Sequence, residues 1–390
     1  MKIAHTADWH LGKIVSGFLM LEDQKYILNE LIKSLKDNHI EVLIISGDIY
    51  DRSIPPQEAV KLLDDVIYEI ISNLKIEIFI IPGNHDSAQR LSFASKLYND
   101  NGLHIIGSFY KEIPKIILTD KHGPVNFYLL PYFIPNQISK MFEDDENIQI
   151  KTFNDAFKTI IDYNKPFIDT SLRNILITHG FFGYLNEENN IFYDQITSPS
   201  ELSIGGADII DISPASFFDY IALGHLHSPQ KVKNPLFRYS GSLLKYSVDE
   251  SNQNKSVTLI DIKEKNNIDL NFIHLTPIRD LRIVTGYMRD LCESFESTSL
   301  ISDDYVFVEL LDKDAVFDVI PRLRQTFKNI IGVKMINQFS NDNNIIINKN
   351  KPENKDFSTL FYEFYTSVSG QDLDEEKKEI IANILSNLDH

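Results

Sequence analysis

Cysteine is almost absent from the sequence: Cys292 is the only one in 390 residues. A single cysteine excludes an intramolecular disulfide and any zinc site built from thiolates. A metal site in this chain would therefore have to use histidine, aspartate, glutamate and asparagine side chains. Cys292 itself is expected to be an inert core residue.

Long apolar runs and positive charge are also missing. No run approaches the roughly 18 apolar residues of a membrane span, and the first residues, MKIAHTADWH, lack the layout of a signal peptide. We therefore expect a cytoplasmic protein. The net charge of −18 argues against a broad basic surface that binds nucleic acid by itself. A polyanionic substrate would need metal ions, a local basic patch or a partner.

What the sequence does contain is one pattern that occurs five times: a short run rich in Ile, Val and Leu, followed at once by polar residues. The runs are KIAH, VLIIS, IEIFII, ILIT and YIAL, and helix-like stretches such as 19–35 and 57–74 separate some of them. Such runs are typical of buried strands, so the pattern predicts an α/β fold. Because sites form beyond the carboxyl ends of the strands in α/β sheets, we expect these polar side chains to share one edge.

The polar residues after the runs are of types that bind metal ions. Seven are candidate ligands: Asp8, His10, Asp48, Asn84, His179, His225 and His227. Any one alone could be an ordinary turn or loop residue, but seven together would repel and be costly to bury without cations. If one carboxylate bridges, each of two ions receives four protein ligands. This mixed ligation suits manganese, iron or zinc, and two ions roughly 3.5–4 Å apart suit phosphoryl hydrolysis.

Five short motifs give the sequence a resemblance to a known family. DWH, GD, GNHD, THG and GHLH follow one another as in the calcineurin-like metallophosphoesterase superfamily. Within it, HTADWHLGK, GNHDSAQRL, YIALGHLHSPQ and YSGSLLKYSVDE are similar to the SbcD family, the nuclease subunits of bacterial SbcCD complexes. The resemblance implies a metallophosphoesterase β-sandwich flanked by helices, with a small α+β capping domain and a C-terminal helical hairpin.

The resemblance also implies a role for each candidate ligand. One manganese ion would be held by Asp8, His10, Asp48 and His227, and the other by Asp48, Asn84, His179 and His225, so that Asp48 bridges them. His85 would be catalytic, protonating the leaving sugar oxygen or stabilising the transition state, whereas Asp86 would tie down the loop.

The stretch GDIYDRS carries a second resemblance, to the protein phosphatases, in which such an aspartate orients the catalytic histidine and the arginine binds phosphate. The archaeal nuclease relatives have a histidine in the place of Asp51. Here Asp51 is expected to orient His85 and Arg52 to contact a DNA phosphate. A solvated turn is an equal alternative for both residues.

The length and the 43% hydrophobic content allow two or three domains. We expect a nuclease domain over 1–277, a capping domain that helps hold DNA over 278–348, and a linker with a partner-docking segment over 349–390. Residues 279–347 are predicted to form strand, strand, helix and strand. The alternative for this small α+β unit is a dimerisation or packing module.

The C-terminal segment is predicted to form two amphipathic helices separated by Gly370. Their apolar stripes consist of Leu360, Phe361, Phe364 and Val368 in the first, and of Ile380, Ile381, Ile384 and Leu388 in the second. These stripes could pack on their own chain. The resemblance favours docking onto the coiled coil of an SbcC-type ATPase.

Taken together, these features predict a manganese-dependent DNA phosphodiesterase. The resemblance implies exonuclease activity on duplex ends, endonuclease activity on hairpins and single strands, and a role in DNA repair, recombination and replication. It also implies a homodimer within a heterotetramer, in which the ATPase supplies ATP dependence, because this chain has no GxxxxGK[ST] loop. The alternatives are a phosphatase or small-molecule phosphodiesterase, favoured by GDIYDR and the acidic balance, and a non-catalytic DNA-end scaffold.

Overall fold

The structure is a computed structural model that describes residues 1–145, 148–185, 191–192, 209–297, 302–312 and 316–336, together with Asp374 and Lys378. The chain divides into two compact units, Met1–Ile283 with Asp303–Val306, and Val284–Ser302 with Phe307–His390. Among the helices of these described ranges, none combines the length and apolarity needed to cross a membrane.

The first sheet of unit 1 contains three of the predicted strands. Its order is β17-β16-β1-β4-β5-β6, with β1, β4, β5 and β6 parallel and the other two antiparallel. KIAH, VLIIS and IEIFII are confirmed as β1, β4 and β5, and the C-terminal pair β16 and β17 closes the other side. The bounds are β1 Lys2–Thr6, β4 Val42–Ser46, β5 Glu77–Ile81, β6 Leu103–Ile105, β16 Val257–Ile262 and β17 Ile268–Ile273.

The second sheet of unit 1 contains the other two predicted strands. Its order is β14-β15-β13-β9-β8-β7, and β15, β13, β9 and β8 are parallel. The polar residues therefore follow strands of two sheets, and the expectation of a single sheet edge was wrong, because apolar runs do not specify which strands pair. The bounds are β7 Lys115–Asp120, β8 Gly123–Leu130, β9 Arg173–His179, β13 Tyr220–Gly224, β14 Gln230–Val232 and β15 Asn234–Tyr239.

A hydrophobic core fills the space between the two sheets. Ile44 and Phe79 of the first sheet pack against Phe127 and Ile177 of the second, and all four are fully buried. The rings of Phe79 and Phe127 stack with their centroids 4.5 Å apart. Burying each such side chain contributes about 1.5–3 kcal/mol. This packing makes a β-sandwich and fixes the strand ends of one sheet against those of the other.

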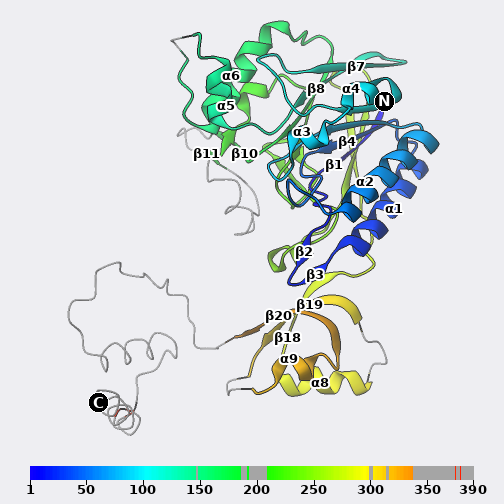
Figure 1. Cartoon of the computed structure of the whole chain (residues 1–390), viewed down its shortest axis with the longest axis vertical. Helices are drawn as coiled ribbons and strands as arrows, with labels where there is room; N and C mark the ends of the chain where they lie inside the picture. Colours follow the sequence, from blue (N-terminus) through cyan, green and yellow to red (C-terminus); the bar gives the residue numbers. More distant parts are fainter. Residues whose placement is uncertain are drawn as a thin grey trace. The chain divides into compact units, whose positions relative to one another are not determined.

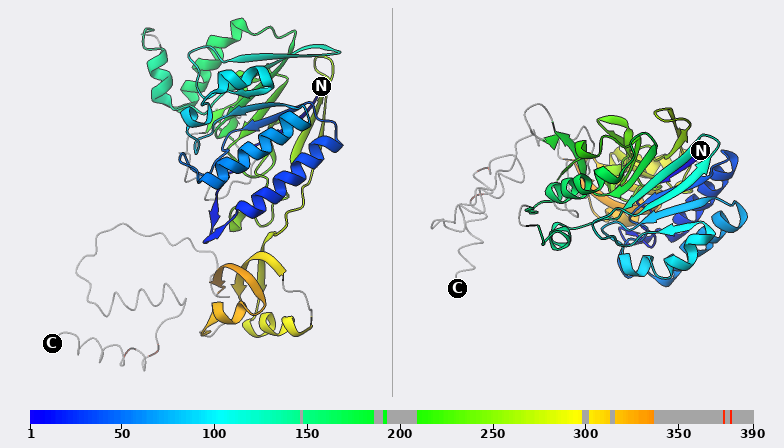
Figure 2. Two further views of the ribbon diagram at one scale, coloured as in Figure 1. Left: turned by 45° about the vertical axis from the view of Figure 1, so that its right-hand side comes forward. Right: turned by 90° about the horizontal axis from the view of Figure 1, so that it is seen from above.

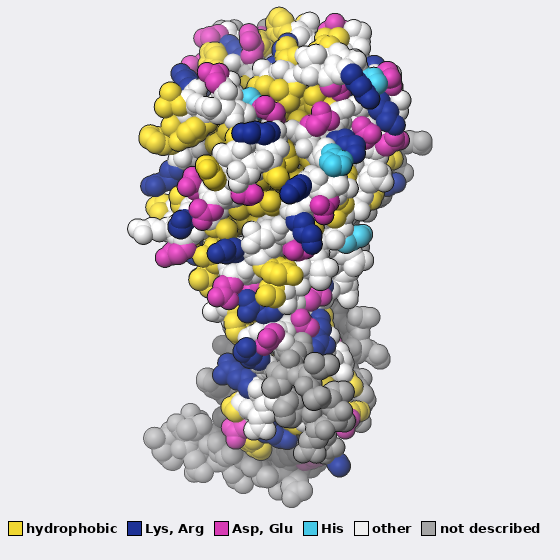
Figure 3. Space-filling view, turned by 90° about the vertical axis from the view of Figure 1, so that its right-hand side faces the viewer, with side chains coloured by type: hydrophobic (Ala, Val, Ile, Leu, Met, Phe, Trp, Pro, Cys, Tyr) yellow, Lys and Arg dark blue, Asp and Glu magenta, His cyan; other side chains and the backbone are white. Residues whose placement is uncertain are grey.

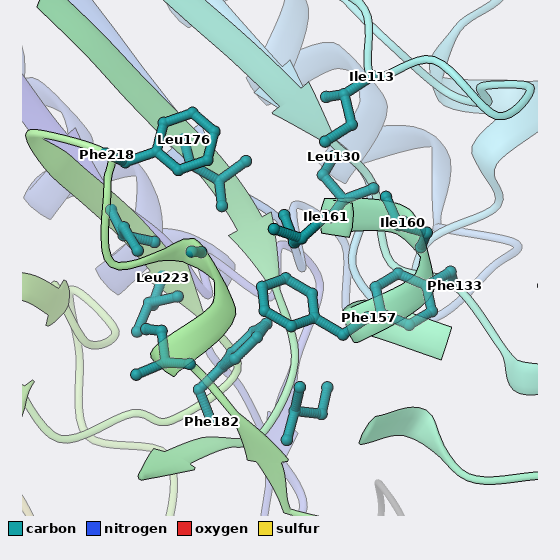
Figure 4. Packing of buried hydrophobic residues seen from close by; sticks show 14 of the residues in the cluster. Ile113, Leu130, Phe133, Phe157, Ile160, Ile161, Leu176, Phe182, Phe218 and Leu223 are labelled. Carbon is teal, nitrogen blue, oxygen red and sulfur yellow. The ribbon is translucent and has the colours of Figure 1, made fainter. Parts of the chain in front are cut away.

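Helices cover both outer faces of the sandwich (Figure 1). Helices α1 (Leu21–Asp37) and α2 (Gln57–Tyr68) lie together on one side, and α5 (Pro135–Met141) and α6 (Phe153–Asn164) lie on the other (Figure 2). Helix α6 begins at a capping box between Thr152 and Asp155, and its apolar face meets the second sheet through Phe157, Ile160 and Ile161 (Figure 4). This is the flanked sandwich that the resemblance implied.

Short elements complete unit 1 between the larger ones. A π-helix, η1 (Glu69–Asn73), extends α2, and two small sheets pair β2 with β3 and β10 with β11 and β12. The bounds are β2 Ile14–Val15, β3 Phe18–Leu19, α3 Ala88–Leu91, α4 Ser95–Tyr98, η2 Asn99–Asn101, η3 Lys165–Phe167, β10 Phe182–Leu185, β11 Ile191–Phe192, β12 Ile210–Asp211, η4 Ser213–Ala215 and η5 Val248–Glu250.

A three-stranded sheet of order β18-β19-β20 begins at the end of unit 1 and continues in unit 2. Its strands are β18 (Leu281–Gly286), β19 (Ser302–Leu310) and β20 (Phe327–Met335), accompanied by α8 (Met288–Ser297) and α9 (Val319–Leu323). The predicted order of elements omitted α8, whose buried Met288 and Leu291 are too few to give a clear helical stripe. The predicted tail helices over 349–390 lie outside the described residues, apart from Asp374 and Lys378.

Candidate metal centre

The structure brings all seven candidate ligands together at one end of the sandwich. Each lies at or just after the carboxyl end of a strand: Asp8 and His10 after β1, Asp48 after β4, Asn84 after β5, His179 at the end of β9, and His225 and His227 after β13. Five of them are buried, and Asn84 and His227 are partly exposed. The same ends of the two sheets thus converge on one centre.

The ligand atoms form two groups, each of which could hold a metal ion. Asp8, His10 and His227 make one group and Asp48, His179 and His225 the other, and within each the ligand atoms lie within 4.8 Å of one another. In the first, the Nε2 atoms of His10 and His227 are 3.0 Å apart. The amide oxygen of Asn84 joins the second, 3.0 Å from His179 Nε2 and 3.1 Å from His225 Nδ1.

Asp48 lies between the two groups. Its Oδ2 is 3.7 Å from His10 Nε2 and 3.5 Å from His179 Nε2, whereas its Oδ1 accepts a hydrogen bond from the backbone N–H of His85 at 2.9 Å. One carboxylate oxygen therefore faces a member of each group. This is the geometry required of a residue that bridges two ions.

The ionisation of the buried groups indicates a centre suited to cations. Burial raises the pKa of Asp8 to about 7. Burial also acts to raise the pKa of Asp48, but His179 and His10 hold that pKa below its usual range, and Asp48 in turn raises the pKa of His179 to about 9 despite burial. Two buried carboxyl groups in one centre share their charge unwillingly, and divalent cations would relieve this. Carboxylate, imidazole and amide donors fit such ions.

The backbone at the centre is strained. Four of the seven candidate ligands have positive φ angles, namely Asp8 (55°), His10 (45°), Asp48 (51°) and His225 (115°). Such conformations cost on the order of 1–3 kcal/mol each in residues other than glycine. Backbone hydrogen bonds hold two of these turns in place, from Asp8 to the carbonyl of Gly47 and from His10 to that of Asp48, both 3.0 Å. The fold therefore stores strain where it positions ligand side chains.

Glycines allow the loops to pack against the ring of His179. A Cβ atom on Gly224 would lie 2.8 Å from His179 Nδ1, and one on Gly83 would lie 2.7 Å from His179 Cε1 and would also collide with Asp48. Contacts below 3.0 Å to a carbon of this kind essentially never occur. The glycine in PGNHD is therefore required by close approach to two ligands as well as by the turn.

Asp86 has the structural role expected of it. Its Oδ2 accepts hydrogen bonds from the backbone N–H groups of Ile49 and Gly83, both at 3.0 Å, and its Oδ1 accepts one from Tyr50 at 2.9 Å. Asp86 thus ties the loop after β5 to the loop after β4. The side chains of Asn84 and Asp48, which these loops carry, are held together by this link.

His85 lies beside the two groups rather than within the ligand set proposed above. Its Nδ1 donates to the backbone carbonyl of Asp51 at 2.9 Å, and its ring packs edge-on against that of His10, with centroids 4.9 Å apart. Because Nδ1 is engaged, Nε2 is the ring nitrogen left for a substrate. A wider grouping of His10, Asp51 and His85 also lies within the distance limit for a metal site.

Asp51 and Arg52 are placed differently from the phosphatase-like expectation. Asp51 contacts His85 through its backbone carbonyl, and its carboxylate pairs with Lys13 at 2.8 Å. A carboxylate that orients the histidine, as in the protein-phosphatase arrangement, is therefore not what the geometry offers. Arg52 is exposed.

Reasoning from the sequence missed the residues that support the ligands from behind. The buried side chain of Gln24 donates to the carbonyl of His10 at 2.8 Å and accepts from the N–H of Gly12 at 2.9 Å. The available signal was a polar residue on the core-facing stripe of α1, in register with Ile27, Leu28 and Leu31. Glu250 and Lys255 were missed as well, although Glu250 ends the motif YSGSLLKYSVDE.

Comparison with known proteins agrees with this geometry. Residues 1–229 match the model of the calcineurin-like phosphoesterases. The chain belongs to this family. It is also 32% identical over 388 residues to SbcD, one of the two subunits of the nuclease SbcCD, from Staphylococcus epidermidis, in an alignment that covers 99% of this chain and 98% of the relative. The chain thus belongs to the SbcD branch, and family membership implies that it binds divalent metal ions.

Solved structures similar to this chain share little sequence identity with it. The anchor GAP50 of the inner membrane complex of Plasmodium is 12% identical, with a TM-score of 0.42 and coverage of 70% of this chain and 84% of that one. A dimetal phosphatase from Danio rerio is 10% identical, with a TM-score of 0.39 and coverage of 71% and 98%.

The position of Asp48 makes a prediction about metal binding. Asp48→Asn should weaken binding at both metal positions, because it removes the charge that both share, whereas His10→Ala should chiefly weaken one. Titration calorimetry of Mn²⁺ into the metal-free chain measures both affinities. Two ions bound to Asp48→Asn at wild-type affinity would show that Asp48 does not bridge.

Proposed function

We propose that this chain is a manganese-dependent DNA phosphodiesterase, the nuclease component of an SbcCD-type complex. The observation that carries this proposal is the placement of Asp48 between two ligand groups, with His85 beside them. Two divalent ions bound there would neutralise charge on a phosphodiester and activate the attacking water. The seven ligands would hold the ions, with Asp8, His10, Asp48 and His227 at one position and Asp48, Asn84, His179 and His225 at the other.

His85 would act on the leaving group. Its Nδ1 proton is engaged by the Asp51 carbonyl, so the ring is held in one orientation and, as an imidazolium, carries its second proton on Nε2. Transfer of that proton to the departing sugar oxygen would avoid the release of an alkoxide. Lys13, paired with Asp51 at the same loop, and the exposed Arg52 add positive charge near the path of a DNA phosphate.

DNA is favoured over a small phosphate ester for two reasons. The similarity to the staphylococcal SbcD extends over nearly the whole chain, well past residue 229, so it includes the modules outside the catalytic sandwich. The carboxylate of Asp51 is also engaged by Lys13 rather than by His85, which removes the feature that favoured a phosphatase. We assign unit 2 as a capping domain that helps hold DNA, and we expect cleavage of duplex ends, hairpins and single strands in repair, recombination and replication.

A direct assay tests this function. Wild-type chain and the Asp48→Asn variant would be offered hairpin DNA and an aryl phosphate with Mn²⁺, Mg²⁺ or Zn²⁺, with and without an SbcC-type ATPase and ATP. Cleavage of the hairpin by the wild type with Mn²⁺, absent from the variant, supports the proposal. Turnover of the aryl phosphate alone would instead assign a phosphatase, and no turnover of either would indicate a scaffold.

The geometry of His85 predicts a variant that separates chemistry from metal binding. His85→Ala should lower DNA cleavage by roughly 10²–10⁴-fold, the usual contribution of general acid catalysis, while Mn²⁺ stoichiometry and melting temperature stay near those of the wild type. Turnover, metal content and melting temperature would be measured on one preparation. Loss of an ion together with activity would mean that His85 is a ligand.

One face of unit 1 supports the expected homodimer. Hydrophobic side chains gather among charged ones on the face that carries α1 and α2 (Figure 3). A groove of about 1220 Å³ runs along α2, α3 and α4, and Tyr68, Phe93 and Tyr98 line it. Phe93 and Leu97 are 78% and 75% exposed beside it. Projecting apolar side chains and a groove on one face suit an isologous interface with a second copy.

Charge placed on this face should separate the dimer. Phe93→Glu is expected to convert a dimer into a monomer, because two carboxylates would be buried against apolar side chains. Phe167→Glu is a matched control, since Phe167 is 65% exposed on η3. Sedimentation velocity gives the mass of each variant. A Phe93→Glu chain that stays dimeric, or a wild type that is monomeric, would contradict the assignment.

The C-terminal segment is proposed to dock on the ATPase partner. A chain that ends at Lys351 lacks both predicted amphipathic helices but keeps all seven candidate ligands, so it should bind two ions and fail to co-purify with an SbcC-type partner. The full-length chain is the control. If the shortened chain binds the partner equally well, the helices pack on their own chain instead.

A further inference from the structure

A buried glutamate lies directly behind the candidate ligand His227. Glu250, which is 1% exposed, accepts a hydrogen bond on Oε1 from His227 Nδ1 at 2.9 Å, and its Oε2 accepts one from the ammonium of Lys255 at 2.6 Å. The hydroxyl of Ser247 lies 3.2 Å from the same Oε1. Glu250 ends the 3₁₀ turn η5, so its backbone is fixed close to the centre.

Lys255 holds the backbone of the same histidine. Its ammonium donates to the carbonyl of His227 at 2.8 Å, and it also contacts Ser242 Oγ at 2.9 Å and Gln253 Oε1 at 2.7 Å. Glu250 thus holds the ring of His227 while Lys255 holds its main chain. Buried ion pairs are often replaceable by apolar residues without loss of stability, so stability alone does not account for an ion pair at this position.

This arrangement determines which nitrogen of His227 can bind a metal ion. Because Nδ1 donates its proton to Glu250, the neutral ring carries its lone pair on Nε2, the atom 3.0 Å from His10 Nε2. His179 is oriented in the same way, but its Nδ1 donates to the neutral carbonyl of Ser46 at 2.8 Å. Of the four candidate ligand histidines, His227 has a carboxylate within hydrogen-bond distance of its second ring nitrogen.

We propose that Glu250, held in place by Lys255, is a positioning residue that orients His227 and increases its strength as a ligand. This inference rests on the proposed metal centre. A carboxylate acceptor makes a ligating imidazole a better donor, and loss of such a partner typically lowers metal affinity 10–100-fold. The effect falls on one position, that of Asp8, His10, Asp48 and His227, so the two ions differ in their dependence on Glu250.

The test is metal binding by the Glu250→Gln variant. Titration calorimetry of Mn²⁺ into the metal-free full-length chain should show one ion bound roughly 10–100-fold more weakly and the other unchanged. Glu250→Asp keeps the buried charge beside Lys255 but withdraws the carboxylate by one carbon. It should lose affinity for the same single ion, and it replaces Glu250→Gln as the test if that variant does not fold.

Asp219→Asn is the matched control. Asp219 is a buried carboxylate that pairs with Lys265 at 2.7 Å and accepts from the N–H of Asn174 at 2.7 Å, at the opposite strand ends from the ligands. This variant should lower the melting temperature of the metal-free chain and bind both ions normally. If Glu250→Gln binds both ions like the wild type, or loses both in proportion to a fall in melting temperature, the positioning role is refuted. A wild type that binds no Mn²⁺ would refute the metal centre itself.

Discussion

The structure depends on one constraint: ionisable side chains from both sheets must be buried together at the end of the sandwich. Asp8 and Asp48 are both buried there, with imidazoles on either side. Charges in such a place are tolerated only when they are paired or bind cations. The surrounding features follow from this, because each of them fixes the distance between groups that would otherwise repel or be left without a partner.

The sandwich meets this constraint by using two sheets instead of one. The core between β5 and β8, where Phe79 stacks on Phe127, fixes the height of one set of strand ends against the other. Gly83 and Gly224 then let the loops approach the ring of His179 more closely than any larger residue would allow. Strained backbone at Asp8, His10 and Asp48 is tolerated because packing and backbone hydrogen bonds over-determine it.

Part of this could be predicted from the sequence, and the division has physical causes. Strands such as VLIIS and the ligand types that follow them are local signals, so β4 and Asp48 were accessible to prediction. Pairing between strands is not local, so the assignment of β9 and β13 to a second sheet was not. The role of Asp51 depended on which of its oxygens faces His85, a matter of loop conformation that residue identity does not determine. Helix α8 has too few buried residues to give a period.

The metal centre also needs residues beyond the segment that defines the family. The match to the calcineurin-like phosphoesterases ends at residue 229, after the last ligand. Yet β16 pairs with β1, with Leu259 opposite Ala4, and without it β1 would be an exposed edge strand just before Asp8 and His10. Glu250 and Lys255 lie in the segment that leads to β16 and reach back to His227. The chain therefore completes its metal centre only after residue 250, which explains why the sandwich extends past the family motif.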